Sequence, residues 1–97
     1  MKKLIDQITE IAEQAFEACG YEKKLGRVTL SNRPDLCEYQ CNGAMAGAKL
    51  YHKAPIAIAK DVAEALSGNS AFAEVTAAAP GFINLGLSGA YLAAYLE

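Results

Sequence analysis

The fold of this chain is decided by one stretch of sequence, Ala79-Pro80-Gly81-Phe82-Ile83-Asn84-Leu85-Gly86-Leu87-Ser88. A Pro-Gly turn comes first, and apolar residues then alternate with others. Because successive strand side chains point to opposite faces, Ile83, Leu85 and Leu87 share one face, which we expect to be the core. The other face presents Phe82 and Asn84, with the bare Gly86 beside them.

The outward face of this strand combines an aromatic ring with an amide. A ring can stack on an unpaired nucleobase, and an amide can donate to and accept from the base edge. Phe82 and Asn84 are therefore candidates for reading a nucleic acid. A single Phe-x-Asn pair also fits an edge strand with a partly buried ring, so both interpretations stay open on these ten residues alone.

A β-hairpin and a terminal helix are predicted in this half of the chain. Residues 72–78 form the partner strand, and the Pro80-Gly81 turn joins them to residues 82–87. Ser88 is a natural N-cap for the last helix. The apolar residues of that helix are Tyr91, Leu92, Tyr95 and Leu96.

Upstream of the hairpin, an amphipathic helix is predicted over residues 2–19, with Gly20 as its cap, followed by a strand over residues 27–30. Pro34 favours a turn over residues 31–35. Composition then predicts a helix from Tyr39 to about Leu50, whose two glycines indicate a close approach to another element. The next helix begins at Pro55 and ends at Gly68. Its predicted buried stripe is Ile56, Ala59, Val62, Ala63 and Leu66.

These elements predict an α+β fold: a small antiparallel sheet with a β-hairpin in the C-terminal half, covered on one face by about four helices. The 97 residues make one domain with little room for a deep enzymatic cleft. No run approaches the ~18 apolar residues of a membrane span, and acidic residues follow Met1-Lys2-Lys3 where a secretory signal has an apolar block. We expect a cytoplasmic protein with no membrane partner.

Cysteine and histidine are the residues that could carry metal or nucleophilic chemistry. Cys37-x-x-x-Cys41 with His52 gives part of a zinc ligand set, but only Cys19 remains as a fourth ligand, and it lies on the buried face of the first predicted helix. A cysteine nucleophile would need His52, the only histidine, as its base. We therefore expect reduced thiols, no metal site and no catalytic residue.

The net charge of −2 argues against indiscriminate nucleic-acid binding and against a DNA partner. The charge is unevenly distributed, however, since residues 20–60 carry seven basic against three acidic side chains. This middle third is suited to face phosphates, although ordinary solvated charges explain the same counts. The residues that would make such a patch are Arg27, Arg33, Lys49, His52, Lys53 and Lys60.

Three blocks, in this order and spacing, carry a family resemblance: Arg-Pro-Asp-Leu-Cys-Glu-Tyr-Gln-Cys-Asn-Gly-Ala-Met over residues 33–45, Lys-Ala-Pro-Ile-Ala-Ile-Ala over residues 53–59, and Pro-Gly-Phe-Ile-Asn-Leu-Gly-Leu-Ser over residues 80–88. They resemble the N-terminal additional domain of arginyl-tRNA synthetase. The resemblance covers residues 1–97 as a single domain, with the catalytic and anticodon-binding domains absent. It implies a domain beside the catalytic core that grips the outer corner of tRNA.

In that family an aromatic-x-amide pair on the hairpin strand contacts the nucleotide around position 20 of the D-loop, and here the pair falls on Phe82 and Asn84. Gln40 and Asn42 match the family block, either as RNA contacts or, slightly favoured, as hydrogen bonds at a helix start. The secondary candidates for tRNA binding are Arg33, Gln40, Asn42, Lys49 and Lys53.

The family's ligases join arginine to tRNA(Arg) with ATP and magnesium, using a His-x-Gly-His signature and a lysine-containing loop. With one histidine and 97 residues, this chain has neither feature. The resemblance therefore implies a monomeric, non-catalytic tRNA-binding module that needs no cofactor of its own. The alternative is a structural α+β module that docks on protein, for example on the parent's catalytic domain, and has no direct RNA role.

Overall fold

The structure is a computed structural model that describes residues 3–31 and 37–96. Its elements, in chain order, are α1 (Leu4–Ala18), the 3-10 helix η1 (Lys23–Gly26), β1 (Val28–Leu30), β2 (Tyr39–Cys41), α2 (Gly43–Tyr51), α3 (Pro55–Ser67), β3 (Phe72–Ala78), β4 (Phe82–Leu87) and α4 (Gly89–Leu96).

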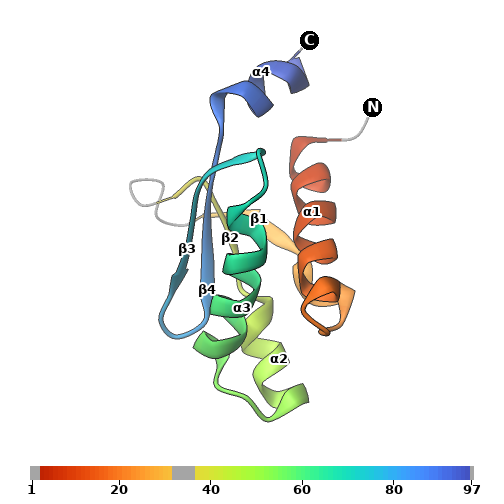
Figure 1. Ribbon diagram of the computed structural model, residues 1–97, viewed down its shortest axis with the longest axis vertical. Helices are drawn as coiled ribbons and strands as arrows, with labels where there is room; N and C mark the ends of the chain where they lie inside the picture. Colours follow the sequence, from red (N-terminus) through yellow and green to blue (C-terminus); the bar gives the residue numbers. More distant parts are fainter. Residues whose placement is uncertain (1–2, 32–36, 97) are drawn as a thin grey trace.

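One antiparallel sheet organises these elements, and its strands lie in the order β1-β2-β4-β3. The predicted hairpin is the β3–β4 pair, with Ala78 opposite Phe82. Helices α1, α2 and α3 pack on one face of the sheet, while α4 extends beyond its end (Figure 1). In the part of the chain that the structure describes, no helix covers the opposite face, which we call the outer face. The α+β prediction is therefore confirmed.

The prediction of a helix from Tyr39 is wrong in its first turn. Residues 39–41 form β2, which lies between β1 and β4 and pairs with both. A strand of three residues is too short to show a period of two, so its identity depends on the partners that hydrogen-bond to it. The helix starts only at Gly43.

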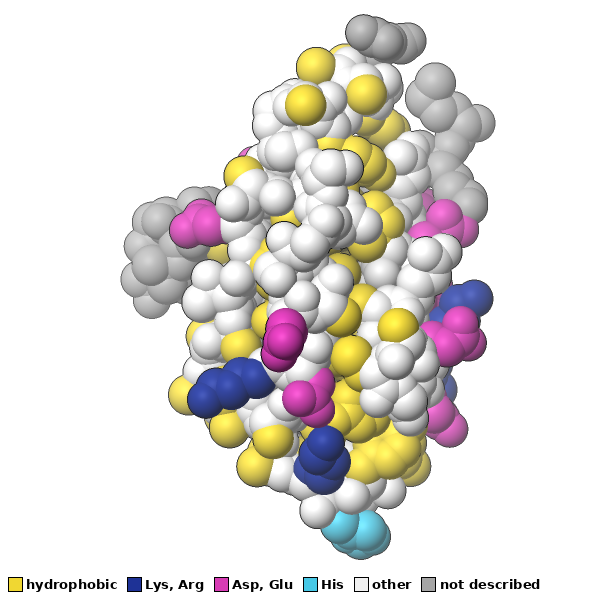
Figure 2. Space-filling model, in the orientation of Figure 1, with side chains coloured by type: hydrophobic (Ala, Val, Ile, Leu, Met, Phe, Trp, Pro, Cys, Tyr) yellow, Lys and Arg dark blue, Asp and Glu magenta, His cyan; other side chains and the backbone are white. Residues whose placement is uncertain are grey.

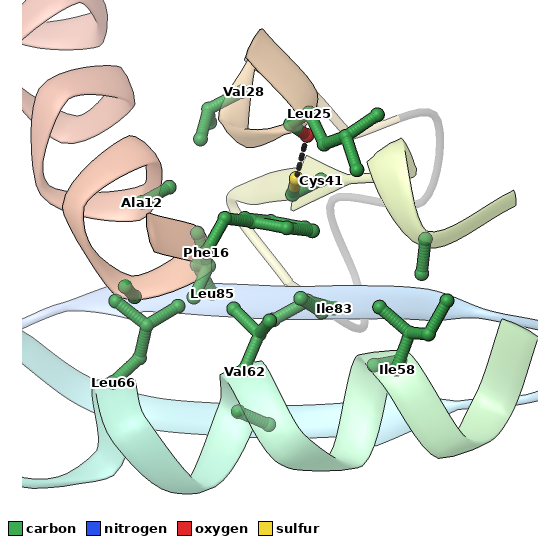
Figure 3. Close-up of a cluster of buried hydrophobic side chains, with 14 of the residues drawn as sticks. Ala12, Phe16, Leu25, Val28, Cys41, Ile58, Val62, Leu66, Ile83 and Leu85 are labelled. Atoms are coloured by element: carbon green, nitrogen blue, oxygen red, sulfur yellow. Dashed lines mark hydrogen bonds between the residues drawn. The ribbon is translucent and has the colours of Figure 1, made fainter. Parts of the chain in front are cut away.

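The core lies between the sheet and the three helices and confirms the alternation predicted for the hairpin strand. Ile83 and Leu85 of β4 are fully buried, against Phe16 of α1 and Val62 of α3 (Figure 3). In α3, Ile58 is also fully buried, whereas the predicted Ile56 is only half-buried. Burying side chains of this size contributes about 1.5–3 kcal/mol each, so this cluster is the main source of stability.

The glycines of α2 do mark a close approach, as predicted. A Cβ built on Gly43 would lie 1.7 Å from the carbonyl oxygen of Leu25, so only glycine lets the first turn of α2 meet η1. Two capping predictions are confirmed as well. Gly20 ends α1 with a φ of +87°, and Ser88 Oγ accepts a hydrogen bond of 3.1 Å from the Tyr91 backbone N–H.

Candidate nucleic-acid interface

The outer face carries its polar side chains in a row across the sheet. The register places Thr29 opposite Gln40, Gln40 opposite Asn84, and Asn84 opposite Thr76. Because neighbouring Ile83 and Leu85 point into the core, the side chain of Asn84 points outward. The sheet thus joins four strands into one line of hydroxyl and amide groups.

Gln40 and Asn84 are linked directly, although they are 44 residues apart in sequence. Gln40 Nε2 donates a hydrogen bond of 2.9 Å to Asn84 Oδ1. This bond fixes both amides and leaves the side-chain N–H groups of Asn84 and the side-chain oxygen of Gln40 without a partner among the described residues. A base edge needs both a donor and an acceptor from its reader, and the paired amides present both.

The helix-start interpretation is wrong for Gln40, since it lies in β2. Asn42 does hold the N-cap position of α2, but its side chain makes no capping bond there. Asn42 follows Cys41, which pairs with Ile83, so it lies at the end of the sheet where Phe82 begins β4. Both amides predicted as secondary candidates are therefore close to the main pair.

Phe82 is half-buried at the first position of β4. The turn before it is clamped, because a Cβ on Gly81 would lie 2.5 Å from Pro55 Cβ and 3.1 Å from Met45 Sδ. The hairpin tip thus packs on the start of α3 and on α2. This contact fixes the turn that carries Phe82 before any partner binds, which reduces the entropy lost on binding.

Beside Asn84 the outer face is hollowed. The hollow has a volume of about 220 Å³, with Gly86 on one side and Thr76 and Glu74 on the other. Cys37 and Leu85 complete the lining. Sequence reasoning missed Thr76 and Glu74, although pairing residues outward from the Pro80-Gly81 turn would have placed Thr76 opposite Asn84.

Of the predicted phosphate contacts, Lys53 is held by the protein itself. Its Nζ donates to the Tyr21 hydroxyl at 2.6 Å and lies 3.3 Å from Asp61 Oδ2, and the Tyr21 hydroxyl donates to the same Asp61 oxygen at 2.7 Å. The hydrogen bond from Tyr21 lowers the pKa of Asp61, and the bond to Tyr21 raises the pKa of Lys53. This cluster ties the segment between α1 and η1 to α3 and to the loop that precedes it.

The remaining basic residues come from different elements of the fold. Lys49 lies exposed in the last turn of α2 and has no partner among the described residues. Arg27 lines a groove between α1 and β1 together with Glu13. Arg33 lies outside the described residues. On the face shown in Figure 2, basic and acidic side chains lie side by side and make no continuous basic field.

The cysteines lie in separate environments. Cys41 is fully buried, its Sγ donates to the Leu25 carbonyl oxygen at 3.5 Å (Figure 3), and burial raises its pKa to about 11. Cys37 Sγ contacts Ser31 Oγ at 3.2 Å, and Cys19 Sγ contacts the Asp61 carbonyl oxygen at 3.5 Å. Within residues 3–31 and 37–96, no three Cys, His, Asp or Glu side chains gather to hold a metal ion.

The described helices are also all too short or too polar to cross a membrane.

The sequence itself matches a family described as the arginyl-tRNA synthetase N-terminal domain, over residues 2–87. The chain belongs to this family.

Curated relatives of this arginyl-tRNA synthetase N-terminal domain agree with the family match. The chain is 53% identical over 97 residues to the arginine–tRNA ligase of Alkaliphilus oremlandii and 52% identical over 97 residues to that of Agathobacter rectalis. Each match covers 100% of this chain and 16% of the relative. The chain thus spans about one sixth of the length of these ligases.

The fold also has a counterpart among solved structures. Arginyl-tRNA synthetase from Plasmodium falciparum superposes with a TM-score of 0.81 at 22% identity, over 99% of this chain and 18% of that one. At this identity the likeness concerns the fold, which is the α+β arrangement described above.

Proposed function

We propose that this chain is the tRNA-binding N-terminal segment of an arginine–tRNA ligase and that its outer face contacts the D-loop at the elbow of tRNA(Arg). The observation that carries the proposal is the arrangement of Phe82 next to the hydrogen-bonded Gln40–Asn84 pair on a sheet face that no described helix covers. Phe82 stacks on a splayed base, and Asn84 with Gln40 bonds to its edge.

The parent ligase joins arginine to tRNA(Arg) with ATP and magnesium, in the cytoplasm and as a monomer. This segment contributes recognition and holds no catalytic residue or cofactor. Its partners are tRNA and the ligase's own catalytic domain, and it takes no DNA or membrane partner. Family membership and the length of the relatives support the assignment of this chain to an arginine–tRNA ligase.

The docking alternative requires an apolar surface continuous with Phe82. The exposed apolar side chains near the C-terminal end are on α4, where Leu92 and Leu96 are 37% and 73% exposed; Figure 2 shows hydrophobic side chains over that helix. Phe82 and α4 lie at opposite ends of β4, about 17 Å apart at 3.3 Å per residue. The row between them is polar, which favours RNA over protein at the outer face.

Replacing Asn84 with alanine tests the base contact. We expect kcat/KM for aminoacylation by the ligase that carries this chain to fall about 3- to 10-fold, because a hydrogen bond contributes about 0.5–1.5 kcal/mol. Gln14→Ala is the matched control, since Gln14 is an exposed amide on α1. Equal kcat/KM values for the two variants would remove Asn84 from the interface.

Replacing Lys49 with alanine tests the phosphate contact. Each phosphate contact contributes about one unit to the slope of log K against log salt, so Lys49→Ala is expected to reduce that slope by about 1. Lys53→Ala should reduce it less, because Lys53 is already paired with Asp61. Both slopes are obtained by measuring the binding of tRNA(Arg) between about 50 and 200 mM salt. Over this range several phosphate contacts change the affinity by about an order of magnitude or more. An unchanged slope for Lys49→Ala excludes that contact.

A further inference from the structure

The hollow on the outer face is formed mainly by residues of the two hairpin strands, β3 and β4. Glycine at position 86 leaves it wider, since a Cβ there would lie 3.4 Å from Glu74 Cβ and 3.8 Å from a carboxylate oxygen of Glu74. Its volume of about 220 Å³ is below the ~300–1,000 Å³ of pockets that take drug-sized ligands. It has room for one small planar group.

The lining determines which group fits. Glu74 supplies a carboxylate, Thr76 a hydroxyl and Asn84 an amide. A second carboxylate, that of Glu38, lies near Gly86, but its Oε1 already accepts a hydrogen bond of 2.7 Å from the Leu87 backbone N–H. The Glu74 carboxylate has no partner among the described residues. Two carboxylates repel a phosphate, whereas an unpaired carboxylate accepts strongly from N–H donors.

The hollow is too far from Phe82 to belong to the same base. Phe82 and Gly86 are four residues apart on one strand and on the same face, which is about 13 Å. A base stacked on Phe82 has its edge at Asn84, the midpoint of that distance. The hollow beyond Asn84 is in reach of the next nucleotide along the RNA.

We propose that this hollow is a second base site, which takes the nucleobase adjacent to the one stacked on Phe82, and that Glu74 accepts a hydrogen bond from an exocyclic amino group on it. The site therefore favours cytosine, adenine or guanine over uracil, which has carbonyl oxygens and no exocyclic amino group. This inference rests on the proposed function, since it requires RNA on the outer face.

The test uses the ligase that carries this chain and tRNA(Arg) transcripts with cytidine or uridine at each of the two nucleotides that flank the one contacted by Phe82. We expect cytidine to bind about fivefold or more tightly than uridine at one flanking position. Glu74→Gln should bring that ratio to within about twofold, because a carboxamide can also donate to the uracil oxygen. The wild-type and Glu74→Gln ratios compare the same two transcripts, so effects of the base change on tRNA folding cancel between the two ratios.

Two further variants separate the outcomes. Glu64→Gln, an exposed glutamate on α3, must leave the ratio unchanged. Gly86→Ala places a methyl group in the hollow at an ordinary contact distance and should weaken binding of all the transcripts about fivefold without lowering the melting temperature. A ratio of one at both positions, or a ratio that survives Glu74→Gln, overturns the second base site. If Phe82→Ala still weakens binding in that case, the proposed function stands without it; if Phe82→Ala has no effect, both fail.

Discussion

Replacing Phe82 with alanine is expected to weaken binding of tRNA(Arg) by the ligase about 5- to 150-fold, because stacking of one base on an aromatic ring contributes about 1–3 kcal/mol. The ring is half-buried and its turn is clamped between Met45 and Pro55, so little ordering is needed when the base arrives. The dissociation constant at fixed salt is the direct measurement.

Four controls isolate the stack from other effects. Phe82→Tyr keeps a ring and should keep most of the affinity, whereas Phe82→Leu keeps the apolar volume and should lose it. Leu50→Ala removes an apolar side chain that is 49% exposed on α2 and should have no effect. With tRNA that lacks the base at the contacted nucleotide, Phe82→Ala should not weaken binding any further. If Phe82→Ala weakened binding of that abasic tRNA by the same factor, Phe82 would act through the folding of the domain and not through stacking.

Replacing Gly43 with alanine is expected to destabilise the domain by about 3 kcal/mol or more, at the upper end of what overpacking costs. The new Cβ would lie 1.7 Å from the Leu25 carbonyl oxygen, so backbone must move, and no side chain can yield instead. In a domain of this size, about 3 kcal/mol lowers the melting temperature by roughly 15 °C. Thermal unfolding followed by circular dichroism measures it.

Gly89→Ala is the matched control for this change. Gly89 is in the first turn of α4, and nothing lies within 4 Å of a Cβ built on it. Alanine is favoured over glycine in a helix by up to about 1 kcal/mol, so stability should hold or rise. If Gly43→Ala melted at the same temperature as Gly89→Ala, the close contact between α2 and η1 would not be needed for folding.

The hairpin and its two faces were predicted correctly because the residues that determine them are neighbours in the sequence. A Pro-Gly turn and strict alternation fix which residues of β4 are buried, and Ile83 and Leu85 are in the core as expected. The same holds for α1 and α3, whose apolar residues repeat at helical spacing over 15 and 13 residues. A periodic pattern is easier to recognise when it extends over a longer segment.

The parts that sequence reasoning missed depend on pairing between distant residues. β2 is three residues long, and its strand conformation comes from β1 and β4 on either side. The Gln40–Asn84 bond spans 44 residues and needs the register of that pairing. Likewise, the predicted convergence of basic residues did not account for Asp61, which pairs with Lys53.

The central claim is that the outer face of the sheet binds tRNA(Arg). A titration of the ¹⁵N-labelled chain with tRNA(Arg), followed by amide chemical shifts, tests it most directly. The largest changes are expected at the backbone amides of Gln40, Phe82 and Asn84 and at the side-chain N–H groups of Asn84, with little change in α1. Shifts concentrated on α1 or α4, with those of Gln40, Phe82 and Asn84 unmoved, would contradict the account.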